Sequence, residues 1–232
     1  MKLKIYSMVF SVFIVFTVCA QEKSGKAVYH VKRDTKVSEG SMFISNEMDE
    51  LIYEMSNADY EVLFNGNTMS FKREKLIVSK NNRININFAD LEVTGSDTLF
   101  SNLKSKNFVH KKLFNGSKLY SIEDDLPKIE WKIHNVEKEI DGYKCKKATA
   151  TLKANEYFLK DTEATAWFVE NKTIVFPSKY FGLTGTIVEL TVNDFNYKLK
   201  SLEFYDEVEI VSPKEGMPIS QKDFKKVFDN NK

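Results

Sequence analysis

Apolar and polar residues alternate with a period of two along most of this chain. In "TIVELTV", Val188, Leu190 and Val192 alternate with polar residues, and the same pattern recurs at 26–32 and 202–210. Successive side chains of a β-strand point to opposite faces of the sheet, so the alternation predicts strands with one apolar and one polar face. Such strands are typical of antiparallel sheets that are buried on one side.

Turn signals separate these strands at short intervals. "VLFNGNTMSFK" predicts two short strands about a hairpin-type turn at "NGN", and Asp141 and Gly142 separate two further strands. Asn-Gly and Asp-Gly are favoured in two-residue hairpin turns, because both turn positions need a positive φ. Closely spaced strands with such turns predict a meander.

Two segments have helical spacing instead. Apolar residues at i, i+3, i+4 and i+7 in "NEMDELIYEM" predict a helix over 46–57, and "SQKDFKKVF" predicts a weaker one over 220–230. We therefore predict an α+β, mostly β fold with one or two short helices. Its core is a single curved antiparallel sheet, open or shaped as a half-barrel, of the kind that lipoprotein carriers have.

The first twenty residues have the pattern of a secretory signal peptide. Lys2 and Lys4 precede an apolar stretch at 5–18, and Val18 and Ala20 occupy the −3 and −1 positions of a cleavage site after Ala20. The mature protein is then exported, to the periplasm or to the outer membrane. We expect residues 21–212 to form one β-rich domain and residues 213–232 a C-terminal tail with a short helix.

Two alternatives for the N-terminus stay open. Cys19 is the acylated residue if the signal is that of a lipoprotein, although Val18 stands where such a signal prefers a small residue. An uncleaved membrane anchor is the other alternative. No later segment approaches the 18 apolar residues of a membrane span, so no transmembrane span is expected after signal cleavage.

Charge and motifs exclude several functional classes. The net charge is +1, with 34 Lys and Arg against 33 Asp and Glu, which does not favour nucleic-acid binding. His30, His110 and His134 lie in separate segments without metal-ligand spacing, so no metal and no cofactor is predicted. No nucleophile-elbow, zinc-protease or phosphate-loop motif is present in the sequence. We therefore expect a non-enzymatic protein.

Cys145 is the one cysteine that remains after signal cleavage. The lysines in "YKCKKA" would lower the pKa of a neighbouring thiol, but on a strand Lys144 and Lys146 point to the face opposite Cys145. We expect a buried, apolar cysteine. A hydrolase with a site assembled from Cys145 or from acidic residues is kept as an alternative.

The stretch "PSKYFGLTGTIVEL" (177–190) is interpreted as a structural corner that leads into a core strand. Pro177 fixes its φ, Gly182 and Gly185 suit positive φ or a close backbone approach, and Leu183 between them can turn inward. The alternating strand that follows removes the helix N-terminus that a phosphate-binding loop requires.

Three aromatic residues are candidates for ligand or partner binding. Tyr180 and Phe181 precede the strand, where no pleat forces them into the core, and Trp167 lies on the face opposite Ala166 and Phe168. Aromatic side chains concentrate in binding sites because they bury a large area on contact. The alternative is that all three are core residues of an aromatic-rich sheet.

Four stretches occur in a fixed order: Trp131, "IDGYKCKKA" (140–148), "AWF" (166–168) and "FPSKYFGLTGTI" (176–187). Together they resemble the GLPGLI family, which comprises secreted proteins of the Bacteroidetes group. That family has a Trp-containing strand, a GY-x-C turn and strand, an A-W-aromatic strand and the loop that gives it its name. The likeness extends over most of the mature chain.

This sequence departs from the family in the naming loop. Thr184 stands where the family has proline, Thr186 where it has leucine and Phe176 where it has glycine. The resemblance implies a periplasmic or outer-membrane-associated β-rich protein of no established activity. It also implies an accessory role, since such proteins look to be encoded beside TonB-dependent outer-membrane transporters.

We therefore predict a non-enzymatic accessory or binding protein that acts with a TonB-dependent outer-membrane transporter or another envelope protein. One alternative is a periplasmic carrier of an apolar ligand or lipid. The hydrolase described above is a second alternative, and a structural envelope protein without a ligand is a third. The carrier and the structural protein differ in whether the concave face of the sheet encloses a cavity.

Overall fold

The alternating segments of the sequence assemble into one sheet. A computed structural model describes residues 23–33, 57–73, 98–114, 118–158, 160–171 and 173–230. The elements are β1 (Ser24–Arg33), β2 (Asn57–Asn65), β3 (Thr68–Arg73), β4 (Thr98–Asn102), β5 (Asn107–Phe114), β6 (Lys118–Asp125), β7 (Lys132–Ile140), β8 (Tyr143–Leu152), β9 (Thr162–Glu170), β10 (Gly185–Val192), β11 (Phe195–Tyr205), β12 (Met217–Ile219) and helix α3 (Gln221–Asp229).

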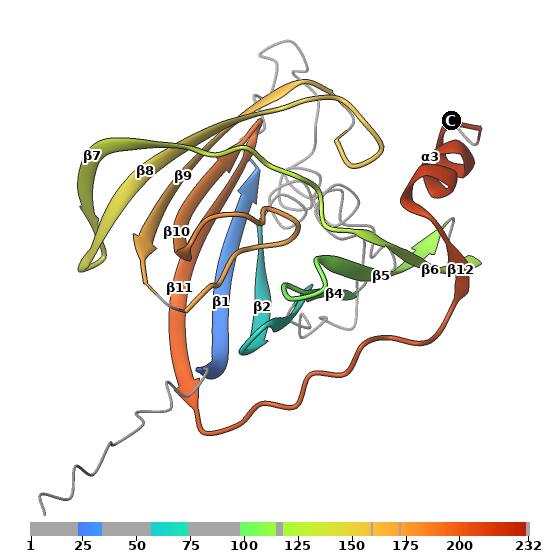
Figure 1. Cartoon of the computed structure of the whole chain (residues 1–232), viewed down its shortest axis with the longest axis horizontal. Coiled ribbons are helices and arrows are strands. Elements are labelled where there is room, and N and C mark those ends of the chain that lie inside the picture. Colours follow the sequence, from blue (N-terminus) through green and yellow to red (C-terminus); the bar gives the residue numbers. More distant parts are fainter. Residues whose placement is uncertain are drawn as a thin grey trace, which may run out of the picture.

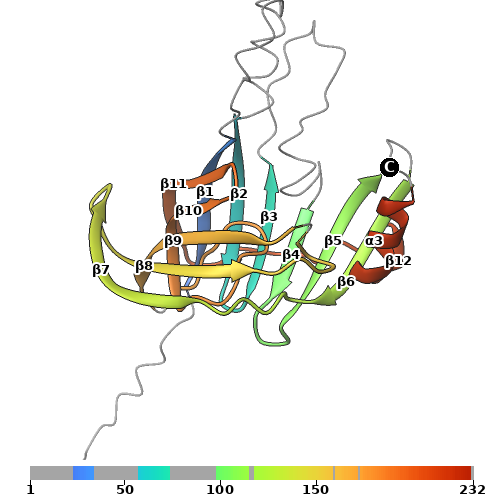
Figure 2. The same cartoon turned by 90° about the horizontal axis from the view of Figure 1, so that it is seen from above.

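The sheet has twelve strands in the order β12-β6-β5-β4-β3-β2-β1-β11-β10-β9-β8-β7. All neighbouring strands are antiparallel except β12, which runs parallel to β6. The sheet curves from β7 at one edge round to β6, β12 and α3 at the other, and its two edges do not meet (Figures 1 and 2). The predicted fold, a single open and curved sheet with a short helix, is confirmed.

The two faces of the sheet differ as the alternation predicts. On β1, Ala27, Tyr29 and Val31 are fully buried on the inner face. On the outer face, Glu61 of β2 forms ion pairs of 2.9 Å with a lysine of each neighbouring strand, Lys26 and Lys72. Cross-strand pairs of opposite charge are compatible with a face that stays in water.

Both predicted hairpin turns are present. Asn65 pairs with Thr68 across Gly66 and Asn67, of which Gly66 has a positive φ of +56°. Ile140 pairs with Tyr143 across Asp141 and Gly142. The backbone φ is +49° at Asp141 and +83° at Gly142, as a turn of the primed type requires.

Two long connections join distant parts of the sheet. Residues 126–131 lead from β6 across to β7 at the opposite edge (Figure 1), and they place Leu126 in the core. Residues 206–216 lead from β11 to β12, and the Asn65 side chain fixes them by donating a hydrogen bond of 2.8 Å to the Val208 carbonyl. β12 and α3, which lie in the expected tail 213–232, are thus attached to the same sheet.

The predictions for the strand at 202–210, for the two helices and for the signal peptide have different outcomes. The alternation at 202–210 predicts a strand as far as Ile210, but β11 ends at Tyr205, because β1 begins at Ser24, the partner of Tyr205. The helix predicted over 220–230 is present as α3, and Ser220 caps it by accepting a hydrogen bond from the Asp223 amide. The helix predicted over 46–57 and the signal peptide lie outside the described residues, apart from Asn57 in β2.

A buried tyrosine supports an irregularity in β10. The register between β9 and β10 shifts between Ile187 and Glu189, and the Tyr29 hydroxyl donates a hydrogen bond of 2.6 Å to the Ile187 carbonyl at this point. Burial, with a smaller contribution from Tyr143, raises the pKa of Tyr29, so the hydroxyl remains a donor.

Tyr29→Phe should lower the free energy of unfolding by about 1–2 kcal/mol, because it leaves the buried Ile187 carbonyl without this donor. Denaturant unfolding would measure the change. Tyr205→Phe is the control, since its hydroxyl bonds Glu203 at an exposed site and its loss should be close to neutral. An equal effect of the two substitutions would contradict the role given to Tyr29.

Candidate functional site

A cavity of about 330 Å³ lies on the concave side of the sheet. Leu99, Phe108 and Ile122 of β4, β5 and β6 form one wall, and Phe195 and Tyr197 of β11 contribute to the other. Three strands, β3, β2 and β1, lie between β4 and β11 in the sheet. The two walls can face one space only because the sheet curves around it.

The β8–β9 loop forms one side of the cavity. Tyr157, Phe158 and Thr162 line it, and Asn155 shapes the loop because its side-chain oxygen accepts hydrogen bonds from the Tyr157 and Phe158 amides, at 2.7 and 3.0 Å. Thr162 donates a further hydrogen bond of 2.8 Å to the Asn193 side chain, which belongs to the β10–β11 turn.

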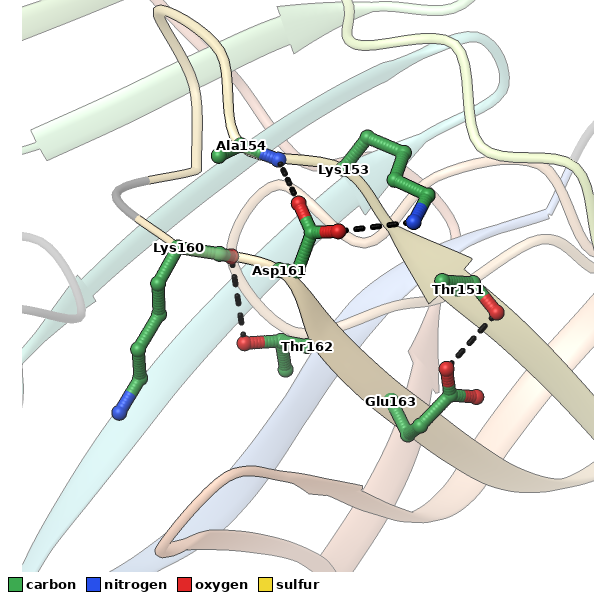
Figure 3. A network of polar contacts seen from close by, with 7 residues as sticks. All are labelled: Thr151, Lys153, Ala154, Lys160, Asp161, Thr162 and Glu163. Atoms are coloured by element: carbon green, nitrogen blue, oxygen red, sulfur yellow. Dashed lines mark hydrogen bonds and ion pairs between the residues drawn. The ribbon is translucent and has the colours of Figure 1, made fainter.

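Asp161 holds the ends of this loop together. Its carboxylate accepts hydrogen bonds from the Ala154 amide at 2.8 Å and from Lys153 Nζ at 2.7 Å (Figure 3). The bond from Ala154, followed by that from Lys153, holds the pKa of Asp161 below its usual value. Two residue pairs further along the hairpin, the Thr151 hydroxyl donates a 2.8 Å hydrogen bond to Glu163.

Asp161→Ala should speed hydrogen exchange at the Ala154 amide severalfold, because that amide loses its acceptor. Since folding lowers the pKa of Asp161, the protection is present above the usual Asp pKa of about 4 and is lost as the pH falls through the lowered value. Exchange measured by mass spectrometry over a pH series would test both statements. Glu163→Ala is the control and should leave Ala154 unchanged; loss of protection in both variants would contradict the prediction.

The segment between β9 and β10 covers the inner face of the sheet and reaches the cavity with Tyr180. The Tyr180 ring is stacked at 6.5 Å from Phe158 and lies edge-on at 5.6 Å from Tyr197. Val175 anchors the segment, because it accepts a 2.9 Å bond from the Ile187 amide. Aromatic pairs in these geometries stabilise the cavity wall beyond the area that they bury.

Helix α3 closes the cavity on the remaining side. Phe224 is buried, and its ring lies edge-on at 5.4 Å from Tyr120 of β6. Phe228, one turn further along, also lines the cavity. The first turn of the helix is fixed by Asp124, whose carboxylate accepts a 3.0 Å bond from the Gln221 amide, at the end of the helix dipole that favours negative charge.

Polar side chains are present in the lining as well. They include His110, Lys112, Glu156, Lys160, Thr162, Ser178, Lys179, Asn193, Gln221 and Lys225. Glu156, Lys160 and Asn193 are exposed, so the cavity reaches solvent beside them. The site therefore combines an aromatic interior with a polar opening.

Of the three aromatic residues predicted to bind a ligand or partner, only Tyr180 lines the cavity. The expectation that it lies outside the core is wrong, since its side chain is only 7% exposed. Phe181 is half-buried, and the centre of its ring lies 5.8 Å from the centre of the Phe176 ring. Trp167 lies on the outer face, where Lys138 Nζ is 5.4 Å from its ring.

The corner predicted at 177–185 has the expected geometry. Gly182 and Gly185 have φ values of +119° and +152°, and Leu183 between them is buried. Trp131 covers Gly182, and its indole donates a 3.1 Å bond to the Phe181 carbonyl. The corner therefore packs against the segment that crosses the sheet.

Cys145 is fully buried in β8. Burial, followed by the charge of Glu189, raises the pKa of its thiol to about 11, so the reactive thiolate is disfavoured at neutral pH. The expected apolar role is consistent with this position, and a buried thiol with a raised pKa does not favour the thiol form of the hydrolase alternative.

The histidines do not converge. His30 Nδ1 lies 2.7 Å from Asp59, His134 Nε2 lies 2.8 Å from Thr149, and His110 lines the cavity. Within the described ranges, no three His, Cys, Asp or Glu side chains are grouped as a metal site. No helix in the described part of the chain is long and apolar enough to cross a membrane.

Most of the cavity lining was not predicted. Phe158 lies in the β8–β9 loop, Phe195 in β11 and Phe224 in α3, and no periodic pattern marks these distant residues as one set. The nearest signal is Asn155, since an Asn at that point of a loop favours a side-chain-to-backbone turn.

No protein-family model matches the sequence, and no curated protein does. Among solved structures, the chain is similar to PNGF-II in two crystal forms, with TM-scores of 0.56 and 0.54 and identities of 15% and 13%. Each match covers 88% of this chain and 32% of the other, so this chain spans about a third of the length of PNGF-II. A LolA-superfamily protein from Nitrosomonas europaea matches 81% of this chain and 88% of its own at 7% identity, with a TM-score of 0.34. The PNGF-II matches show a shared fold.

Proposed function

We propose that this chain is a non-enzymatic binding protein that holds an apolar ligand in the cavity on the concave side of its sheet. The observation that carries the proposal is the cavity itself, about 330 Å³ in volume and walled by aromatic side chains from both halves of the sheet and from α3. Small-molecule sites are concave, largely apolar and of about this size. The carrier, an alternative from the sequence, is thus favoured over a structural protein without a ligand.

The proposal is tested with a neutral apolar dye, N-phenyl-1-naphthylamine, whose fluorescence rises in an apolar environment. Val192→Trp places an indole into the cavity from the end of β10, and we expect it to weaken dye binding about tenfold or more. Thr191→Trp is the matched control, because it places the same indole on the exposed face of the same strand. Binding by Val192→Trp equal to that of the unchanged protein would refute the cavity as the site.

We also propose that the chain belongs to the GLPGLI family and acts beside an envelope partner such as a TonB-dependent outer-membrane transporter. In support, two of the stretches that carry the resemblance are in contact, because Trp131 bonds the carbonyl of Phe181 and covers Gly182. Export to the periplasm or outer membrane is part of the same proposal. Isolation of the native protein from outer membranes, followed by identification of co-purifying proteins and lipids, would test it; recovery of the protein alone would count against a partner.

A further inference from the structure

We propose that the ligand of the concave cavity is a single-chain amphipathic anion, with its apolar chain inside the cavity and its carboxylate or phosphate beside the lysines of the lining. This inference rests on the proposed function, because it assumes that the cavity is a binding site. It adds the chemical class of the ligand.

Positive charge is concentrated at the cavity. The lining contains four lysines and one carboxylate, namely Lys112, Lys160, Lys179, Lys225 and Glu156. The whole chain is nearly balanced, at a net charge of +1, so the excess is local. Of the four ammonium groups, that of Lys225 forms a 2.7 Å ion pair with Asp229, and that of Lys179 donates a 2.5 Å hydrogen bond to the Tyr157 carbonyl. A cleft lined mainly by charge of one sign attracts ligands of the opposite sign.

Two of these lysines lie directly on the aromatic wall. Lys179 Nζ is 4.9 Å from the centre of the Phe158 ring, and Lys112 Nζ is 5.5 Å from the centre of the Phe224 ring. Both rings line the cavity. Ammonium groups are attracted to the faces of aromatic rings, so these contacts keep the charges at the border of the apolar surface. A ligand with an apolar chain and an anionic end matches that arrangement.

Lys160 is the best placed of the four lysines for a test. Its side chain is exposed and extends away from the Asp161 carboxylate (Figure 3). Its ammonium forms no hydrogen bond or ion pair with any residue that the structure describes. The Lys160 carbonyl, in contrast, accepts a 3.3 Å bond from the Thr162 hydroxyl. A substitution of the side chain therefore removes a charge without removing a hydrogen bond or ion pair within the described part of the chain.

The experiment compares four ligands with the same twelve-carbon chain: dodecanoate, dodecyl phosphate, dodecanol and dodecylammonium. Each displaces N-phenyl-1-naphthylamine from the full-length protein at neutral pH. We expect one or both anions to bind about fivefold more tightly than dodecanol, and dodecylammonium more weakly than dodecanol. The preference for anions should shrink as the salt concentration rises, while the affinity for dodecanol stays constant or increases. The order of the two anions distinguishes a carboxylate ligand from a phosphate ligand.

Lys160→Gln should weaken binding of the preferred anion about threefold and leave dodecanol binding unchanged. Lys128→Gln is the matched control, since Lys128 is 87% exposed, pairs with Glu130 and lies outside the lining. If all four ligands bind equally and Lys160→Gln has no effect, the anionic class is wrong although the cavity still binds an apolar ligand. If none of the four binds, the proposed function fails, and this inference fails with it.

Discussion

Gly185→Ala should lower the free energy of unfolding by about 3 kcal/mol or more, the largest effect that we expect from a single methyl group in this protein. A Cβ at Gly185 would lie 2.0 Å from the Val169 carbonyl oxygen and 2.9 Å from its carbonyl carbon. Both atoms belong to the backbone of β9, the strand that pairs with β10, and cannot move like the end of a side chain. The φ of +152° adds strain, because residues with a Cβ rarely adopt it.

Gly142→Ala is the control for this substitution. Gly142 also has a positive φ, +83°, but a Cβ there would meet no atom within 4 Å. Gly142→Ala should therefore lower the free energy of unfolding by about 1 kcal/mol, because it introduces backbone strain alone. Urea unfolding of both variants separates the two contributions. Similar losses at the two glycines would show that β9 and β10 can separate to admit the methyl group, and the close approach would then not be essential.

The contrast between these glycines shows what the sequence could and could not predict. The turn at Asp141 and Gly142 was predictable, because Asp-Gly between alternating segments is a local signal for a two-residue hairpin. A positive φ or a close backbone approach at Gly185 was also expected. The identity of the neighbour, the Val169 carbonyl, was not predictable, since it depends on the register between β9 and β10, including the shift next to Ile187. Nothing in "GLTGTI" specifies that register.

The order of the strands in the sheet could not be predicted from the sequence, for a similar reason. Alternation and turns predict hairpins, and the meanders β2–β6 and β7–β11 are successive hairpins. The placement of β1 between β2 and β11 joins these two halves, and it depends on contacts between segments far apart in the chain. The curvature that brings β4 to face β11 follows from that junction. The cavity was therefore an open alternative until the strand order was known.

At the candidate site, the direction of side chains could be predicted within strands but not in the loops between them. Within strands, the alternation places Val192 and Tyr197 on the inner face, where they line the cavity. Tyr180 lies in a loop, where period two gives no direction. The Ser178 backbone has a φ of +52°, and the Tyr180 amide bonds the Pro177 carbonyl at 3.4 Å, so a tight turn directs the ring inward. A turn of this kind at a serine leaves no clear sequence signal.

Tyr180→Ser should therefore lower the free energy of unfolding by about 3 kcal/mol, because it removes a buried ring that packs against Phe158 and Tyr197. Phe181→Ser should cost about 1 kcal/mol, since that ring is only half-buried. Thermal unfolding of the two single variants measures the difference. The variant Tyr180→Phe retains the ring and should stay close to the unchanged protein both in stability and in binding of N-phenyl-1-naphthylamine.

The same three variants distinguish a wall of the cavity from a surface for a partner. If Tyr180 forms the wall, Tyr180→Ser loses dye affinity as well as stability, whereas Phe181→Ser retains the dye affinity, because Phe181 lies outside the lining. If the pair forms an exposed recognition surface, as the sequence suggested, both Ser variants stay stable and bind the dye normally. That second result would contradict the burial of Tyr180 and, with it, the assignment of this ring to the ligand site.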